Sequence, residues 1–359
     1  MTYERDNIRD MAGYVSGEQP DDPRTIKLNT NENPWPPSPT IDKVLAEVSA
    51  ADLRRYPSPT ADRFRELAAT HHGLSRDHII ATRGGDELLR LVITTFVDPG
   101  QTIAMTDPTY SLYRVLAQIQ NCPVTSVPLD AGWQLPADFA DIANRNGARL
   151  TLIVNPHAPS GRLLRQTVLQ DLANELEGIV LVDEAYVDFI DPELSYDSID
   201  LVRQCPNVIL LRTLSKGYAL AGLRFGYGIA QPDLIAPMLG KTRDSYNLDH
   251  ISQQVAEAAI TDRAWANSIC AKVREERQSL TAALTTLGLS VQPSQSNFVL
   301  ATIPPDKGDA ALLYRALKLQ GILVRYFDEP RLADKLRITI GTPGENQALL
   351  SALASLIPS

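Results

Sequence analysis

The sequence predicts an α/β protein: a large domain built on a mainly parallel sheet covered by helices, followed by a smaller α/β domain. From Asp86 to about Ile229, helical patterns alternate with short apolar runs of the kind expected for strands buried on both faces. Beyond about Gln254, a long helical stretch and further short strands replace this alternation. Strands separated by helices imply parallel pairing, with helices on both faces of the sheet.

The elements are expected in the following order. Residues 1–40 form a polar, proline-rich arm, and we place the large domain at 41–254 and the small domain at 255–359. Apolar residues first show helical spacing in 41–48 and 64–68. Strands of the large domain are expected at 102–105, 124–127, 150–154, 179–182, 208–211 and 224–229. In the small domain, a helical stretch over 255–287 precedes strands at 289–291, 298–301, 322–325 and 336–340 and helices at 310–319 and 345–356.

Composition and charge argue against several classes of protein. The chain has 359 residues, of which 44% are hydrophobic, so it can bury a substantial core. A net charge of −9 argues against nucleic acid or an anionic membrane as a partner. Three scattered cysteines and five histidines without ligand spacing indicate neither a disulfide framework nor a metal site. We expect the cytoplasm, because the start lacks an apolar signal and no apolar run could span a bilayer.

The most informative segment surrounds Lys216, where the apolar run 208–211 gives way to a loop of small residues. A lysine amine that is removed from water loses basicity and can form a Schiff base with an aldehyde. Thr213, Ser215 and Arg224 lie close by in sequence, and hydroxyls with a guanidinium suit a phosphate dianion. An aldehyde that carries a phosphate is pyridoxal phosphate. This segment alone fits a solvated surface lysine equally well.

Two acids, Asp183 and Glu184, follow the apolar run 179–182. A carboxylate at the end of a buried strand is costly unless it meets a cation or a hydrogen-bond donor. The pyridine nitrogen of pyridoxal phosphate stays protonated only beside a fixed anion, and its protonation makes the ring an electron sink. We therefore assign Asp183 to the ring nitrogen and Tyr186 to the phenolic oxygen of the ring. The alternative is that Asp183 only caps a helix.

Two further segments complete a cofactor cradle. The pair Gly84–Gly85 stands directly before an amphipathic helix, where the N–H groups of Gly85 and Asp86 can bind phosphate, although ordinary turns look the same. Asn155 begins a turn that two prolines and a glycine stiffen. The turn could aim the Asn155 amide at the ring oxygen; the alternative is that Asn155 has only a structural role in the turn. Open α/β sheets bind ligands at the carboxyl ends of their strands. Four polar residues stand just past predicted strand ends: Asp107, Asn155, Asp183 and Lys216.

Together these segments resemble the fold-type I pyridoxal-phosphate aminotransferases of class I and II, and within them the histidinol-phosphate aminotransferases. The resemblance covers nearly the whole chain and follows the family's order through 28–34, 55–57, 84–87, 107–110, 155–161, 183–186, 213–216 with Arg224, and 336–341. It implies the fold of that family, with a seven-stranded sheet in the large domain, and it implies a homodimer.

The resemblance also implies roles in holding the cofactor. Lys216 would form the Schiff base and move the proton, while Asp183 holds the pyridinium. Asn155 and Tyr186 would bond the ring oxygen, and Tyr110 would stack on the ring. The phosphate would be held by Gly85, Asp86, Thr213, Ser215 and Arg224, joined by Tyr56 reaching over from the other subunit.

For the substrate, the resemblance implies that Arg325 and Arg337 bind its anionic end, because an arginine fork pairs with carboxylate or phosphate at two points. Tyr14 and Asn33 of the arm would contact the substrate. The implied reaction transfers the amino group of histidinol phosphate to 2-oxoglutarate, giving imidazole-acetol phosphate and glutamate, in histidine biosynthesis.

Several alternatives remain open. Within the superfamily they are an aromatic or broad-range aminotransferase, a decarboxylase of a substrate such as threonine phosphate, and a regulatory relative without catalysis. Outside it, a dinucleotide-binding oxidoreductase is disfavoured because no strand is followed by Gly-x-Gly-x-x-Gly. The sequence departs from its relatives in the turn 155–161, where His157 and Ala158 stand in place of two asparagines. We expect His157 to be solvated, as loop histidines usually are.

Overall fold

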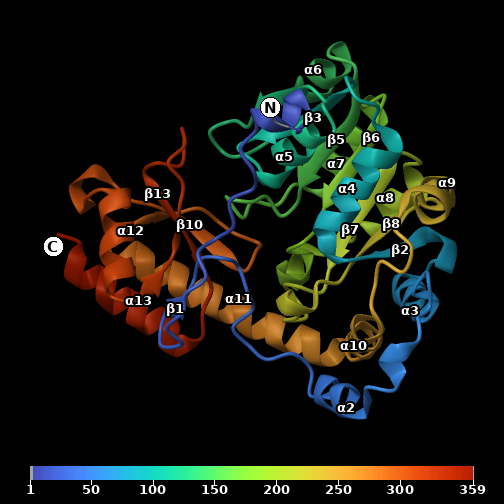
Figure 1. Cartoon of the computed structure of the whole chain (residues 1–359). Coiled ribbons are helices and arrows are strands. Elements are labelled where there is room, and N and C mark those ends of the chain that lie inside the picture. Colours follow the sequence, from blue (N-terminus) through green and yellow to red (C-terminus); the bar gives the residue numbers. More distant parts are fainter. Residues whose placement is uncertain (1–2, 359) are drawn as a thin grey trace.

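The computed structural model describes residues 3–358, and its largest element is a seven-stranded sheet (Figure 1). The strand order is β2-β8-β7-β6-β5-β3-β4. The strands are β2 (Ile79–Thr82), β3 (Thr102–Asp107), β4 (Val124–Pro128), β5 (Ala148–Val154), β6 (Ile179–Asp183), β7 (Val208–Thr213) and β8 (Gly226–Ala230). Every neighbouring pair is parallel except the two formed by β8. The predicted α/β class with a mainly parallel seven-stranded sheet is confirmed; the short edge strand β2 was not predicted.

Strand β6 illustrates why the strands read as continuous apolar runs. Its side chains alternate between two buried cores, so that Ile179 belongs to one core and Val180 to the other. Helix α4 (Gly84–Phe96) contributes to the first core and α7 (Gln166–Glu175) to the second. Burial of each such side chain stabilises the fold by roughly 1.5–3 kcal/mol. The other helices of this half include α3 (Asp62–His72), α5 (Leu112–Ile119), α6 (Phe139–Arg145), α8 (Ile199–Gln204) and α9 (Pro232–Pro237).

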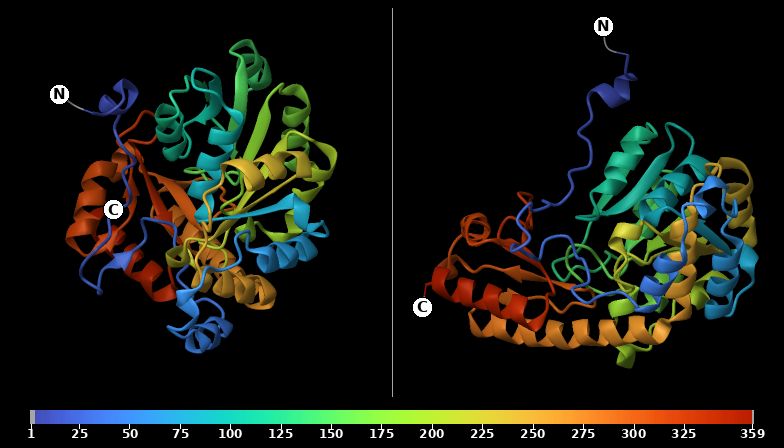
Figure 2. Two further views of the ribbon diagram at one scale, coloured as in Figure 1. Left: turned by 45° about the vertical axis from the view of Figure 1, so that its right-hand side comes forward. Right: turned by 60° about the horizontal axis from the view of Figure 1, so that its bottom comes forward.

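The second half is a four-stranded antiparallel sheet packed with helices. Its strands follow the order β12-β13-β10-β9 and are β9 (Ser290–Val291), β10 (Phe298–Thr302), β12 (Arg325–Tyr326) and β13 (Lys335–Thr339). Its helices include α12 (Ala310–Leu319) and α13 (Pro343–Leu356). The long helix α11 (Arg263–Thr286) runs along one side of both halves and connects them (Figure 2).

Two predicted elements are each divided in the structure. The helical stretch expected over 255–287 is two helices, α10 (His250–Thr261) and α11, separated at Asp262. The Asp262 carboxylate accepts a hydrogen bond from the N–H of Trp265 and caps the start of α11. The strand expected over 322–325 is divided because its two ends have different partners. Residues 322–323 form β11 (Ile322–Leu323), which pairs with the arm, whereas β12 pairs with β13.

The N-terminal arm contacts both halves of the molecule. Its strand β1 (Ile26–Lys27) pairs in parallel with β11. Near the other end, beside α1 (Asp6–Arg9), the side chains of Arg5 and Asn7 donate to backbone carbonyls at the end of α5, each at 2.7 Å. The segment between α1 and β1 therefore crosses from the large half to the small half (Figure 1). Helix α2 (Thr40–Glu47) follows the arm.

Candidate active site

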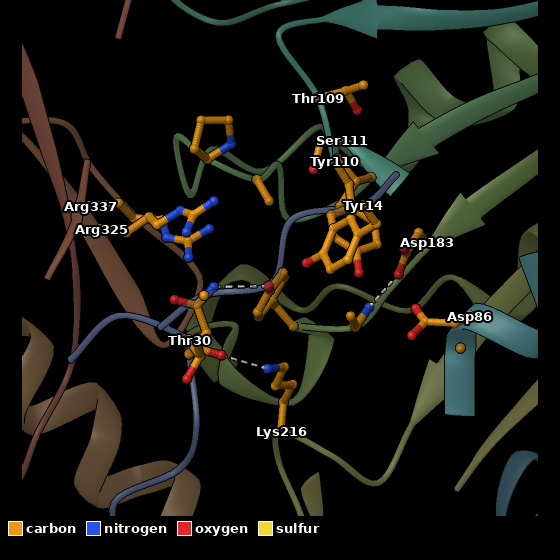
Figure 3. Close-up of a pocket in the computed structure, with 18 of the residues that line it drawn as sticks. Tyr14, Thr30, Asp86, Thr109, Tyr110, Ser111, Asp183, Lys216, Arg325 and Arg337 are labelled. Carbon is orange, nitrogen blue, oxygen red and sulfur yellow. Dashed lines mark hydrogen bonds between the residues drawn. The ribbon is translucent and has the colours of Figure 1, made fainter. Parts of the chain in front are cut away.

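A cavity of about 510 Å³ lies at the carboxyl ends of β5, β6 and β7, and the arm and the second sheet complete its wall (Figure 3). Most of the predicted site residues line it, although they come from distant parts of the chain. They are Tyr14, Gly85, Asp86, Tyr110, Asp183, Tyr186, Thr213, Ser215, Lys216, Arg224, Arg325 and Arg337. Three predicted residues, Asn33, Tyr56 and Asn155, are not part of the wall.

Lys216 follows the end of β7 and extends its amine into the cavity. The amine Nζ donates to the backbone carbonyl of Thr30 in the arm, at 3.0 Å. Burial, with the positive charges of Arg337 and Arg224 nearby, lowers the pKa of Lys216 to about 8. A substantial fraction of this amine is therefore neutral near pH 8, the state in which a lysine acts as a nucleophile or a base.

Asp183 is the last residue of β6, and its carboxyl group lies in the wall beside the Lys216 segment. One carboxylate oxygen accepts from the hydroxyl of Tyr113 at 2.9 Å, and the other accepts from the N–H of Ala185 at 3.1 Å. Burial raises the pKa of Asp183 to about 6. Within residues 3–358 the carboxylate has no ion-pair partner, so a cation in the cavity would be needed to offset its desolvation.

Tyr186 is fixed from the arm. Its hydroxyl accepts a hydrogen bond from the amide Nδ2 of Asn31 at 2.9 Å. Asn31 has a left-handed backbone, with φ of 56°, and its side-chain oxygen accepts from the hydroxyl of Thr339 at 3.1 Å. The Asn297 amide donates to the Asn31 carbonyl at 2.9 Å. Asn31 thus joins the arm, the second sheet and the cavity, a role that sequence reasoning missed although Asn31 stands inside the motif 28–34.

An anion cradle is formed where β7 and the start of α4 meet. The Thr213 hydroxyl donates to Ser215 Oγ at 3.0 Å, and Arg224 Nη1 donates to the same oxygen at 3.4 Å. The backbone N–H groups of Gly85 and Asp86 are in the first turn of α4, where the helix dipole also favours an anion. The Asp86 carboxylate accepts from Arg224 Nη2 at 3.2 Å. Asp86 can therefore contribute to anion binding only through its backbone N–H.

Steric contacts explain why the cradle has glycine at both Gly84 and Gly85. Gly84 has φ of +76°, and a Cβ there would lie 2.8 Å from Arg224 Nη2. A Cβ on Gly85 would lie 2.9 Å from Leu211 Cδ2. Side chains at these positions would therefore displace the guanidinium and the core residue that shape the cradle.

Arg325 and Arg337 lie on the side of the cavity opposite Asp86 and Asp183 (Figure 3). The two arginines are directly paired across the neighbouring strands β12 and β13. Arg337 Nη2 donates to the Asn29 carbonyl at 3.0 Å, whereas its Nε is buried without a hydrogen-bond partner. Burial lowers the pKa of Arg337 from its usual value. Among the described residues neither guanidinium has a carboxylate partner. This side of the cavity is therefore suited to an anionic ligand.

Comparison with known proteins identifies the family. Residues 23–353 match the family described as aminotransferase class I and II. The chain belongs to this family. Among its relatives is histidinol-phosphate aminotransferase 1 of Trichormus variabilis, 46% identical over 358 residues, with 99% of each chain covered. Another is histidinol-phosphate aminotransferase of Syntrophotalea carbinolica, 44% identical over 99% of this chain and 100% of the relative.

Solved structures agree on the fold of this aminotransferase. The histidinol-phosphate aminotransferase of Sinorhizobium meliloti, in complex with pyridoxal-5'-phosphate, superposes with a TM-score of 0.87 at 23% identity. The match covers 99% of this chain and 98% of that one. At this level of identity the likeness establishes the fold alone.

The cofactor of this aminotransferase is pyridoxal 5'-phosphate, as predicted, and the cavity fits it. Asp183 offers a buried carboxyl without an ion-pair partner that could face a ring nitrogen, Lys216 offers an amine of lowered pKa that could meet an aldehyde, and the cradle at Gly85 could take a phosphate. In the described part of the chain no group of histidine, cysteine and carboxylate side chains could hold a metal ion. No helix there is long and apolar enough to cross a membrane.

Asn155 has its side chain fully engaged in the turn. Nδ2 donates to the Leu164 carbonyl at 3.2 Å and to the Tyr196 hydroxyl at 3.0 Å, while Oδ1 accepts from the N–H of Leu164 at 2.8 Å. The Tyr196 hydroxyl in turn donates to Glu184 at 2.9 Å. In this conformation the amide holds the turn, and its predicted contact with the ring oxygen stays a prediction.

The other two residues outside the wall also have partners. Asn33 donates to the backbone carbonyl of Lys216 at 3.2 Å, so it contacts the lysine segment and not the cavity. Tyr56 is 80% exposed and stacks on Tyr246 with ring centroids 4.4 Å apart. Its predicted contact with the cofactor phosphate of another subunit stays a prediction.

The expectation for His157 is wrong. The side chain is 4% exposed and forms hydrogen bonds at both ring nitrogens, with Ser160 Oγ at 2.8 Å and with the Pro108 carbonyl at 3.0 Å. A carbonyl only accepts, so Nε2 carries the hydrogen and Nδ1 accepts from the serine. Burial lowers the pKa of His157 to about 4. This histidine is therefore a neutral structural group that joins two loops.

Tyr113 is a further residue at the site that sequence reasoning missed. It is fully buried on α5 and its hydroxyl is the side-chain donor to Asp183. The available signal was its place three residues after Tyr110. A turn in which the Tyr113 N–H donates to the Tyr110 carbonyl at 3.1 Å brings the two rings to 5.6 Å, centroid to centroid.

Proposed function

We propose that this aminotransferase transfers the amino group of histidinol phosphate to 2-oxoglutarate, giving imidazole-acetol phosphate and glutamate. The relatives at 44–46% identity carry the name of this activity. The structural observation that supports an anionic substrate most directly is the pair Arg325 and Arg337, which has no carboxylate partner in residues 3–358. Both the phosphate of histidinol phosphate and the side-chain carboxylate of glutamate can occupy this pair in turn.

Pyridoxal phosphate, when bound, supplies an aldehyde that takes up the amine and a protonated ring that withdraws electrons from the substrate's α-carbon. Lys216 supplies the base. With its pKa lowered to about 8, its amine Nζ would accept the α-proton of the substrate and give it up again. A positioned base of this kind contributes roughly 10²–10⁴-fold to the rate.

The neighbours of Lys216 would hold and orient the ring. Asp183, held by Tyr113, would keep the ring nitrogen protonated. Tyr186, held by Asn31, would donate to the phenolic oxygen of the ring. Each of these pairs joins a cavity residue to a buried partner, so the reacting groups are oriented before the substrate arrives.

The cradle and the aromatic wall would complete the site. The N–H groups of Gly85 and Asp86, with Thr213, Ser215 and Arg224, would bind the cofactor phosphate. Tyr110 would stack on the ring, and Tyr14 lies edge-on to Tyr110, with centroids 5.9 Å apart. Tyr14 would thus exclude water from one face and contact the substrate.

The proposed functional units are the arm (1–40), the large cofactor-binding domain (41–254) and the small domain (255–359). We propose a cytoplasmic homodimer in which Tyr56 reaches the phosphate of the other subunit. Its exposure and its stacking on Tyr246 are compatible with a place at an interface.

The deciding experiment is an absorbance spectrum of the purified protein with pyridoxal phosphate, before and after addition of histidinol phosphate. A change of the cofactor band with histidinol phosphate, reversed by 2-oxoglutarate, is the expected result. A response to glutamate or to an aromatic amino acid, but not to histidinol phosphate, would replace the proposed substrate by that of an aromatic or broad-range aminotransferase. Release of carbon dioxide from threonine phosphate would support the decarboxylase alternative.

A further inference from the structure

The loop 327–334 connects β12 to β13 and so joins the two strands that carry Arg325 and Arg337. Three of its side chains reach the cavity: Phe327, Glu329 and Leu332. Its backbone hydrogen bonds stay within the loop or the small half, such as those from Leu332 N–H to the Glu329 carbonyl at 3.0 Å and from Ile303 N–H to the Asp334 carbonyl at 2.8 Å. The position of this loop relative to the large half therefore depends on side-chain contacts.

Arg331 attaches this loop to the large half. Its Nη1 donates to the Leu129 carbonyl at 2.6 Å and its Nη2 donates to the Asp130 carbonyl at 2.7 Å. The same guanidinium lies over the ring of Trp133, 4.5 Å from the centroid. A planar fork that donates twice and stacks on a ring is a geometry that arginine can form and lysine cannot.

An apolar cluster lies beneath this contact and is separate from the two main cores. It consists of Leu129, Trp133, Leu300 and Leu332, with Leu135 and Phe327 packed against it. Trp133 has φ of +63° and is only 4% exposed, with the Arg331 guanidinium over its ring. Residues of the large half and of the second sheet therefore share one small core.

A second contact extends from Trp133 towards the cofactor side. Its ring lies 6.0 Å from that of His157, centroid to centroid. His157 donates to the carbonyl of Pro108, which lines the cavity two residues before Tyr110. A continuous set of contacts thus runs from the loop of Tyr110, through His157 and Trp133, to Arg331.

We propose that Arg331 is a positioning residue for substrate binding. By anchoring the loop 327–334 to the large half, it sets how far Arg325 and Arg337 stand from the cofactor. The inference rests on the proposed function, because it concerns the anionic end of the substrate. The role of Arg331 does not depend on histidinol phosphate itself, because the side-chain carboxylate of glutamate would bind to the same two arginines, Arg325 and Arg337.

The test compares Arg331→Ala, Arg331→Lys and the matched control Arg145→Ala. Arg145 is exposed on α6 and donates to a backbone carbonyl of its own helix, so its substitution removes the same charge without touching the loop. Each protein, loaded with pyridoxal phosphate, is titrated with glutamate while the cofactor absorbance is followed. Steady-state kinetics with histidinol phosphate and the affinity for pyridoxal phosphate are measured alongside.

For Arg331→Ala we expect the apparent Kd for glutamate and the KM for histidinol phosphate to rise about tenfold, with cofactor affinity within about twofold of wild type. Arg331→Lys should fall in between, and Arg145→Ala should match wild type. Unchanged substrate affinity in Arg331→Ala, or an equal loss of cofactor affinity, would overturn the proposal.

If Arg331→Ala does not fold, Trp133→Phe provides the test, because it keeps a buried ring but weakens the stacking. It should raise the apparent Kd for glutamate by about threefold, and no change there would equally overturn the proposal. Wild-type protein that reacts with glutamate but not with histidinol phosphate would refute the proposed substrate only. The glutamate titration would then still decide the role of Arg331.

Discussion

Arg325 and Arg337 face each other across the antiparallel strands β12 and β13, inside the same cavity. Like charges directly opposite on a strand pair destabilise the folded state. The proximity of Arg325 is also one reason why the pKa of Arg337 is lowered, after burial. An anion that lies between the two guanidinium groups relieves this repulsion, so the arrangement favours binding of an anionic substrate.

Substitution of Arg337 should therefore affect the substrate much more than the cofactor. Charge-assisted hydrogen bonds are worth about 1.5–3 kcal/mol, so Arg337→Ala should raise the KM for histidinol phosphate about 10–100-fold. Cofactor affinity, read from the absorbance spectrum, should change little. Arg337→Lys, which keeps the charge but loses the fork, should recover only part of the loss. An unchanged KM in Arg337→Ala would remove its proposed role.

Lys216→Ala should bind pyridoxal phosphate through the cradle and Asp183 but should not turn over. The loss in kcat should be at least about 10³-fold, because both the attachment point and the base are removed. Stopped-flow or steady-state assays with histidinol phosphate measure this. Lys43→Ala, at an exposed position of α2, is the control and should remain active. Appreciable transamination by Lys216→Ala would contradict the assignment.

Binding of pyridoxal phosphate to the apoprotein should depend on the protonation of Asp183. The pKa of this carboxyl is raised to about 6, and only the carboxylate pairs with a protonated ring nitrogen. Affinity should therefore be full above pH 6 and fall as the pH drops through 6. The Tyr113 hydrogen bond lowers the pKa of Asp183, so Tyr113→Phe should move this transition to higher pH.

Cofactor titrations between about pH 5 and 8 measure this shift. Tyr314→Phe on α12 removes a hydroxyl outside the cavity and should leave the transition in place. If Tyr113→Phe and Tyr314→Phe titrate alike, the proposed coupling between Tyr113 and Asp183 is absent.

Gly84→Ala should weaken cofactor binding. The residue has φ of +76°, and its Cβ would lie 2.8 Å from Arg224 Nη2. The strained backbone costs about 1–2 kcal/mol, equivalent to roughly 5–30-fold in affinity if the cradle distorts to relieve it. Gly240→Ala, where a Cβ meets nothing within 4 Å, is the matched control. Equal cofactor affinity in the two variants would show that the cradle tolerates a side chain.

The sequence alone supported the prediction of the sheet and of the reactive group. Each predicted strand is a local apolar run, and Asp183 and Lys216 each follow the end of one of them. Their chemistry could be inferred because a lysine or a carboxylate at a buried strand end has few roles available to it. Strand β2 was missed although it is as long as several strands that were predicted; its place at the edge of the sheet is set by pairing with β8, far along the chain.

The tertiary structure alone decided which side chains support these groups. Tyr186 is held by Asn31 across 155 positions of sequence, Asp183 by Tyr113 across 70, and the Leu129 carbonyl binds Arg331 across 202. It also decided that His157 is buried and neutral. Residue type and periodicity are local properties that the sequence records directly. The direction of a side chain, its partner and its exposure depend on how distant segments pack, and packing is settled only in the folded chain.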